Sequence, residues 1–308
     1  MSDSTPERAG TPPDWTALGA ALLTVVLWAS AFVGIRAAAA DLSPGALAVG
    51  RLFVGSVVLG SFALARGGTW PSRRDLVLIA ASGLIWYAIY NVSLNAAETL
   101  VDAGTAAMLV NVGPILIAIF AGIFLSEGFP PRLLIGSAIA FGGTAAIGLA
   151  TSEGRGSDAP LGIILCLVAA VAYAAGVTLL KPAHRRVTAL RVTWLACTVG
   201  FVATLPFAPQ LVDELGGASF ESIAWLVYLG VFPTAVAFTT WAYALSRSTA
   251  GGLGSTTYLV PPVAIVMAWA ILREVPPTLA IAGGLLCIGG VIVARSRGSL
   301  RLPARRGA

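Results

Sequence analysis

Charge is scarce in this sequence. Of the 308 residues only 11% are Asp, Glu, Lys or Arg, whereas 57% are hydrophobic, and the mean hydropathy is +0.87. In a soluble domain roughly a quarter of the residues are charged. This chain therefore cannot cover itself with a water-wetted surface. The shortage of charge excludes a soluble globular protein and predicts that lipid is the solvent.

Residue types that carry out chemistry are also scarce. The single histidine, His184, lies in a basic loop, where we expect it to be solvated, and the cysteines have neither metal-ligand nor disulfide spacing. An enzyme needs a nucleophile with a base, or a cluster of metal ligands. The sequence therefore predicts that the protein is not an enzyme and that it binds no metal or cofactor.

Long apolar runs are what the sequence has instead. A membrane-spanning helix needs about 20 apolar residues. Ten stretches meet this requirement, at roughly 15–37, 43–65, 75–98, 102–125, 130–150, 160–181, 188–208, 219–245, 250–272 and 277–295. We therefore predict an all-α membrane protein with ten transmembrane helices.

The second half of the chain repeats the first at an offset of 147 residues, so that Pro114 falls on Pro261 and Glu127 on Glu274. Each copy holds five of the predicted spans. Because five is odd, the second copy enters the membrane from the opposite side and the two repeats are inverted. Inverted repeats are typical of transporters, in which the substrate site lies near the midplane between the repeats.

The repeat divides the chain into five segments. They are a cytoplasmic N-terminal segment (1–14), a first repeat with helices 1–5 (15–150), an external linker (151–159), a second repeat with helices 6–10 (160–295) and a basic cytoplasmic tail (296–308). Basic residues concentrate in alternate loops, which predicts cytoplasmic termini in the plasma (inner) membrane. The net charge of +5 then indicates contact with anionic lipid rather than with nucleic acid.

Several short motifs resemble the EamA-type branch of the drug/metabolite transporter superfamily. They are Leu27-Trp28-Ala29-Ser30-Ala31-Phe32 in the first span, Arg51 in the second, Pro114 with Leu125-Ser126-Glu127 in the fourth, and Pro261 with Leu272-Arg273-Glu274 in the ninth. Ala29 and Ala31 depart from the Gly and Asn that are usual in that family. The resemblance covers about residues 15–295. It implies ten helices and the export or exchange of small metabolites, most often amino acids, and proton coupling is implied by it alone.

Polar residues inside the spans predict an internal cavity, because a lipid-facing helix surface tolerates few of them. Tyr87, Asn91, Asn95 and Glu98 follow one another at helical spacing in the third span. Such a stripe either holds the ammonium and carboxylate of an amino acid or forms hydrogen bonds between helices. The remaining candidates for substrate binding come from other spans and are Trp28, Asn111, Tyr173 and Tyr258.

Prolines and charges inside the spans are further candidates. Pro114, Pro233 and Pro261 predict helix kinks beside the cavity, or direct contact with substrate. Arg51 either snorkels to the membrane surface, pairs with Glu98 or Asp102, or binds a substrate carboxylate.

Glutamates near the span ends complete the set of charged candidates. Glu127 and Glu274 are each expected to lie against the positive end of the helix that follows, which begins with a proline. Since no Asp, Glu or His lies in the middle of a span, Glu98 is the best candidate for a proton carrier.

These patterns favour a secondary transporter that exports or exchanges a small, amino-acid-like metabolite by alternating access. A facilitator or exchanger without ion coupling is the alternative, and a membrane enzyme or a non-transporting scaffold is a remote one. The predicted partners are a small-molecule substrate and the lipid bilayer. Protons and a second copy of the chain stay open as partners.

Overall fold

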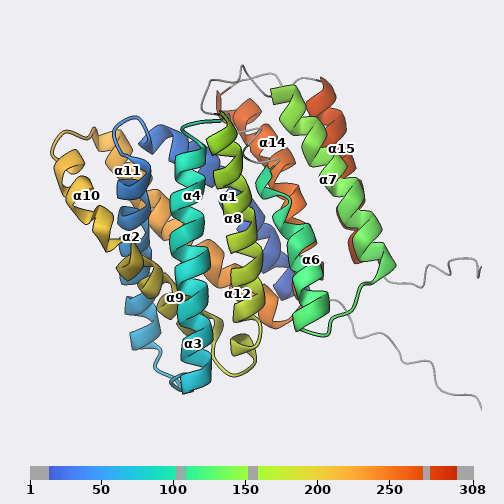
Figure 1. Ribbon diagram of the computed structural model, residues 1–308, viewed down its shortest axis with the longest axis horizontal. Helices are drawn as coiled ribbons and strands as arrows, with labels where there is room; N and C mark the ends of the chain where they lie inside the picture. The colour runs from blue at the N-terminus through green and yellow to red at the C-terminus, as the bar shows by residue number, and fades with distance from the viewer. Residues whose placement is uncertain (1–13, 102–105, 107–108, 152–158, 273–277, 297–308) are drawn as a thin grey trace, which may run out of the picture.

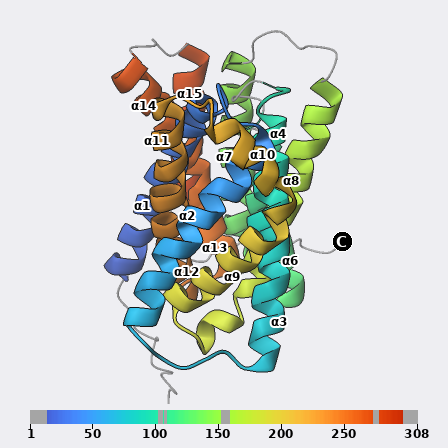
Figure 2. The same ribbon diagram turned by 90° about the vertical axis from the view of Figure 1, so that its left-hand side faces the viewer.

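The computed structural model describes residues 14–101, 106, 109–151, 159–272 and 278–296. These residues form a bundle of helices joined by loops, and none of them belongs to a strand (Figure 1 and Figure 2). The predicted all-α fold is confirmed for this part of the chain. Most of the predicted terminal segment, linker and tail lie outside the described residues, as do Asp102 and Glu274.

The first repeat consists of six described α-helices and one π-helix. In chain order they are α1 (Trp15–Ala38), α2 (Pro44–Ala65), α3 (Arg73–Ser82), the π-helix η1 (Gly83–Ile89), α4 (Tyr90–Ala97), α6 (Gly113–Phe124) and α7 (Pro131–Thr151). Helix starts follow the local sequence: Asp14 and Ser72 accept hydrogen bonds from the first turns of α1 and α3. Pro44 opens α2, where its missing N–H costs nothing.

The second repeat has a similar order of elements. They are α8 (Ala159–Leu180), η2 (Ala183–Arg185), α9 (Ala189–Thr204), η3 (Leu205–Phe207), α10 (Ala208–Leu215), α11 (Phe220–Leu229), the π-helix η4 (Gly230–Val236), α12 (Ala237–Ser246), α13 (Ala250–Gly254), the 3₁₀-helix η5 (Ser255–Leu259), α14 (Val260–Leu272) and α15 (Thr278–Arg295). At the 147-residue offset of the sequence repeat, the bounds of α3 coincide with those of α11, and the bounds of η1 coincide with those of η4. The duplication is therefore visible in the backbone, including its irregular turn.

The inversion of the repeats is seen where α7 packs against its equivalent, α15 (Figure 1). A Cβ added to Gly136 would lie 2.5 Å from the carbonyl oxygen of Gly290, and one added to Gly143 would lie 2.5 Å from that of Gly283. Low numbers in α7 thus face high numbers in α15, so these equivalent helices run antiparallel. Glycine is required at this crossing because the two backbones are in contact.

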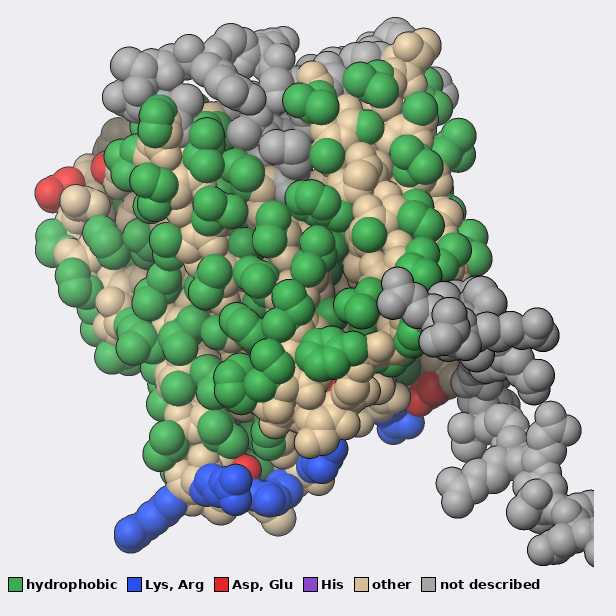
Figure 3. All heavy atoms as spheres, turned by 45° about the vertical axis from the view of Figure 1, so that its right-hand side comes forward, with side chains coloured by type: hydrophobic (Ala, Val, Ile, Leu, Met, Phe, Trp, Pro, Cys, Tyr) green, Lys and Arg blue, Asp and Glu red, His purple; other side chains and the backbone are tan. Residues whose placement is uncertain are grey.

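The outer surface of the bundle matches a lipid environment. Large apolar side chains such as Phe53, Phe62 and Val77 are at least half exposed, and Figure 3 shows apolar side chains covering the face of the bundle between its two ends. Eight helical stretches of the described chain are long and apolar enough to cross a membrane, and shorter apolar stretches lie at Gly113–Phe124 and Pro131–Ile147. The protein is therefore a multi-pass membrane protein, and the full count of ten spans stays a prediction.

The two ends of the bundle differ in charge. One end, which we call the basic end, carries the loops with Arg66, Arg73, Arg186 and Arg247, and Figure 3 shows its Lys and Arg side chains in a row. We call the other end the acidic end. Acidic side chains at this end bind backbone N–H groups of neighbouring segments; they are Asp41, bound to Ser219, and Glu214, bound to Ser43.

The prediction that His184 is solvated is wrong. Its side chain lies in η2 and is only 7% exposed. The basic loop folds back against the basic end of the bundle, where η2 contacts α8, α9 and α12. A polar sequence around a residue therefore did not imply that the residue itself is exposed.

Candidate functional site

A cavity of about 60 Å³ lies inside the bundle between the two repeats. The first repeat contributes side chains from α1, α2, η1, α4 and α6, and the second contributes side chains from α8, α12, η5 and α14. The volume is below the roughly 300–1,000 Å³ of typical ligand pockets. The cavity therefore has to widen before it accepts a metabolite.

Six of the fifteen described residues that line the cavity are aromatic. Trp28 of α1 is the central ring, with centroids 6.0 Å from Tyr173 and 5.6 Å from Phe238, both in edge-to-face contact. Trp86 of η1 lies 5.5 Å from Tyr173, and Tyr90 of α4 lies 6.2 Å from Tyr173. Such walls favour apolar groups on their faces and also attract cations.

Arg51 of α2 is the one cation among the described residues that line the cavity. Its side chain is 4% exposed, and its Nε and Nη2 atoms both donate to the hydroxyl of Thr234 in η4 at 3.2 Å. The Thr234 hydroxyl in turn donates to the carbonyl of Leu229 at 2.8 Å. Among the described residues no carboxylate lies within ion-pair distance of Arg51, and the ion pairs found there, Arg186 with Asp75 and Arg247 with Asp14, lie at the basic end.

Some of the predicted site residues meet at this cavity. Trp28, Tyr173 and Asn111 line it, and so do Arg51 and Pro114. Of the open alternatives for Arg51, snorkelling to the membrane surface does not occur in this conformation. Its only described partner is a hydroxyl, and its guanidinium borders the cavity.

The other predicted binding residues lie elsewhere. The Asn91 amide donates to the carbonyl of Tyr87 at 2.7 Å, and the Asn95 amide donates to the carbonyl of Pro44 in α2 at 3.2 Å. Tyr87 packs against Phe238 outside the lining, and Tyr258 is fully buried beside α7 and α15. Asn95 thus forms the hydrogen bond between helices that the sequence left open as an alternative.

The neighbouring stripe of the same span lines the cavity instead. Trp86, Tyr90 and Leu94 follow one another four residues apart, one position before the predicted stripe. A shift of one residue turns the side chain by about 100° around a helix, and the π-helix η1 adds a further rotation. Sequence reasoning also missed Phe238, whose residue type alone did not separate it from packing residues.

Two of the three prolines lie in the first turn of an α-helix, and the third lies inside a π-helix. Pro114 is at the start of α6 and Pro261 at the start of α14, directly after η5. Pro233 lies inside the π-helix η4, whose wider turn accommodates a residue without an N–H. Glu98 caps the C-terminal end of α4, and among the described residues Arg36 and Arg51 are the charged groups that act on its carboxylate.

Glu127 binds a different helix from the expected one. Its carboxylate accepts hydrogen bonds from the backbone N–H groups of Ala250 at 2.9 Å and Gly251 at 3.3 Å, at the start of α13. The expectation that it lies against the helix following it in sequence is therefore wrong. The ammonium of Lys181 donates to the carbonyls of Leu245 and Ser248, just before α13.

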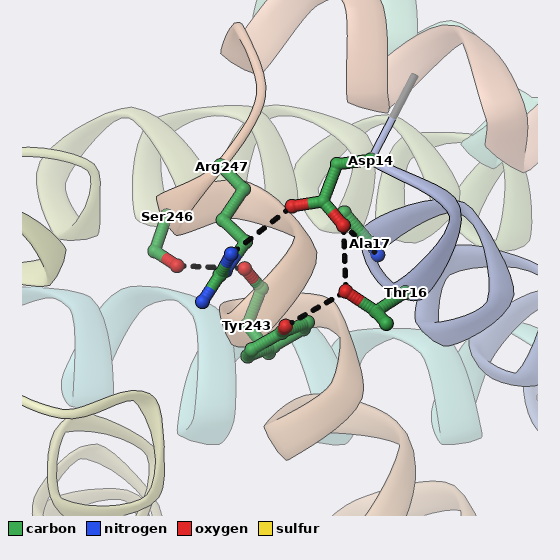
Figure 4. A network of polar contacts seen from close by, with 6 residues as sticks. All are labelled: Asp14, Thr16, Ala17, Tyr243, Ser246 and Arg247. Atoms are coloured by element: carbon green, nitrogen blue, oxygen red, sulfur yellow. Dashed lines mark hydrogen bonds and ion pairs between the residues drawn. The ribbon is translucent and has the colours of Figure 1, made fainter. Parts of the chain in front are cut away.

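A second polar network, around Asp14, lies at the basic end of the bundle (Figure 4). Asp14 accepts from the hydroxyl of Thr16 at 2.6 Å and lies 3.1 Å from the guanidinium of Arg247. Thr16 is also hydrogen-bonded to the hydroxyl of Tyr243 at 3.0 Å, so the start of α1 is tied to the end of α12. Hydrogen bonds from Thr16, Ala17 and Arg247 lower the pKa of Asp14 to about 2.

Comparison with known proteins shows what this architecture is similar to. The model of the EamA-like transporter family matches residues 15–149 and 160–296. A "Probable terminal-alkyne amino-acid exporter" of Streptantibioticus cattleyicolor is 38% identical over 281 residues, which cover 91% of this chain and 94% of that protein. The "Uncharacterized transporter YdfC" of Bacillus subtilis is 31% identical over 269 residues, covering 87% of each chain.

More distant similarities agree with these. The "Uncharacterized inner membrane transporter YedA" of Escherichia coli is 28% identical over 255 residues, covering 81% of this chain and 80% of that one. A crystal structure with 20% sequence identity superposes with a TM-score of 0.71 over 92% of this chain and 98% of the other, which shows a shared fold. Both repeats of the chain match the family model and relatives above 30% identity cover most of its length, so this protein belongs to the EamA-like transporter family.

Proposed function

We propose that this protein is a secondary transporter that exports or exchanges an amino-acid-like metabolite by alternating access, with the cavity around Trp28 and Arg51 as its substrate site. The observation that carries the proposal is the position of the cavity. It is enclosed by side chains of both repeats, and the crossing of α7 with α15 relates those repeats as an inverted pair. The name of the relative from Streptantibioticus cattleyicolor supports the substrate class.

The orientation of the chain follows from its charge. We propose that ten helices span the membrane and that the basic end faces the cytoplasm, because basic loops are retained on that side. Asp14, which precedes α1, lies at the basic end through its bond to Arg247. This orientation puts the N-terminal segment in the cytoplasm, and an even number of spans puts the C-terminal tail there as well.

Transport through the cavity can be tested by filling it. Ala31 lines the cavity, whereas Ala282 of α15 is exposed on the outer surface. In proteoliposomes loaded with labelled amino acids, Ala31→Phe should abolish counterflow, and the matched Ala282→Phe should leave it intact. Equal counterflow in both variants would exclude this cavity as the path, and no counterflow of any amino acid by the unmodified protein would refute the proposed substrate class.

Coupling is a separate part of the proposal. None of the cavity-lining residues that the structure describes is Asp, Glu or His, an observation that favours uncoupled exchange as a second candidate. If protons drive transport, Glu98 is the carrier that we propose. Glu98→Gln should then abolish accumulation driven by a pH gradient and spare exchange. Glu221→Gln at the acidic end is the control, and pH-driven accumulation that survives Glu98→Gln would exclude Glu98.

A further inference from the structure

The charge balance of the cavity is informative about its ligand. Arg51 is buried, its hydrogen bonds go to a neutral hydroxyl, and no described carboxylate pairs with it. A buried charge without a counter-ion is costly. Among the described residues, Glu98 interacts with the charge of Arg51, and Arg36 interacts with that of Glu98; with Glu98 ionised, the three charges sum to one positive charge. A ligand with one negative charge would neutralise this group.

The geometry of the cavity also favours a ligand with a carboxylate group. The hydroxyl of Thr234 accepts hydrogen bonds from the Nε and Nη2 atoms of Arg51, and these bonds fix the orientation of the planar guanidinium relative to η4. The fork of an arginine matches the two oxygens of a carboxylate. The remaining lining includes the rings of Trp28, Trp86 and Phe238. A short apolar side chain fits against these rings, and nothing charged among the described lining residues is placed to bind an ammonium.

We infer that the cavity recognises small monocarboxylates with a short apolar side chain, that Arg51 held by Thr234 is the specificity-determining residue for the carboxylate, and that an α-amino group is tolerated but not required. The inference rests on the proposed function, because it takes the cavity to be the transport site. It goes beyond that function in separating the parts of the substrate that are recognised. Deaminated acids become ligands, and amino-acid amides are excluded.

A ligand panel on the unmodified protein is the first test. Norvaline, pentanoate and norvalinamide share a short apolar chain and differ in the amino and carboxylate groups. Binding to purified protein is followed by tryptophan fluorescence, since Trp28 and Trp86 line the cavity. Norvaline and pentanoate should bind, and norvalinamide should bind at least about tenfold more weakly, the loss expected for a charged hydrogen-bonded contact. Norvalinamide binding as tightly as norvaline would overturn the inference.

Variants then test the residue assigned. Arg51→Gln should bring the affinities for norvaline and norvalinamide to within about threefold of each other, and Thr234→Val should reduce their ratio less. The matched control is Arg66→Gln, because Arg66 is exposed at the basic end and outside the lining, and it should keep the ratio of the unmodified protein. An unchanged ratio in Arg51→Gln would overturn the assignment. If Arg51→Gln does not fold, the ratio in Thr234→Val decides in its place.

Transport separates the inference from the proposed function. Labelled norvaline is measured in counterflow with each panel member as competitor. Carboxylate-selective binding without counterflow would refute the proposed function and leave the inference standing. Counterflow that norvalinamide inhibits as well as pentanoate does would refute the inference alone. Neither binding nor counterflow of any carboxylate would refute both.

Discussion

Glu127 holds the start of α13 in place, and its removal should open the basic end of the bundle. The chain from α13 through η5 runs from this end to Thr257 at the cavity wall, so it lies between them. In this structure the Glu127 carboxylate accepts two backbone hydrogen bonds, from Ala250 at 2.9 Å and Gly251 at 3.3 Å. The carboxylate belongs to the first repeat and the helix to the second, so the contact must break if the repeats move apart.

The size of the effect follows from those two bonds. A hydrogen bond to a charged group contributes about 1.5–3 kcal/mol, and this half-buried site takes the lower end of that range. The two bonds to the carboxylate therefore contribute about 3 kcal/mol together. Glutamine keeps one neutral oxygen, whose hydrogen bond contributes about 1 kcal/mol. Glu127→Gln should therefore destabilise the closed basic end by about 2 kcal/mol, which shifts the ratio of closed to open conformers by roughly 30-fold.

A cysteine at the cavity wall reports this shift. In a background without Cys166, Cys197 and Cys287, Thr257→Cys is labelled by a membrane-impermeant thiol reagent added to the basic end. Glu127→Gln should raise the labelling rate by roughly 10- to 30-fold. The matched control, Glu221→Gln at the acidic end, should leave the rate unchanged. A rate in Glu127→Gln within about twofold of the parent would refute the proposal that Glu127 holds the basic end closed.

Other features of the structure make further predictions. Gly143→Leu should destabilise the protein by about 3 kcal/mol or more, measured as thermal unfolding in detergent, because the backbone of α15 at 2.5 Å cannot yield; an unchanged transition would contradict the close crossing. The Ser219 hydroxyl and N–H, with a second serine hydroxyl, lower the pKa of Asp41 from 3.8 to about 2, so its contribution to stability is present above about pH 4 and is lost as the pH falls through 2. Asp41→Asn should thus flatten the acid dependence of unfolding, and an identical pH profile would exclude this contact. A cysteine at Gly217 should react with an impermeant reagent in intact cells and one at Gly67 only after permeabilisation, and the reverse would invert the topology.

Much of the architecture was determined by the sequence itself. Apolar length and the shortage of charge imposed membrane-spanning helices, because lipid offers no other way to satisfy the backbone. The 147-residue offset predicted matching elements, and the structure shows them down to the paired π-helices η1 and η4. Trp28, Asn111 and Tyr173 were also identified from sequence, because large or polar groups in separate spans tend to gather in the interior.

Only the tertiary structure decided which side of each helix faces the cavity. Helical spacing groups Tyr87 with Asn91 equally well whether the stripe faces a cavity or a neighbouring helix, and the packing of the third span turned Trp86 and Tyr90 inward instead. The partner of Arg51 is a hydroxyl 183 positions along the chain. Contacts between the repeats depend on how the two halves dock, and periodicity within one helix carries no information about that docking.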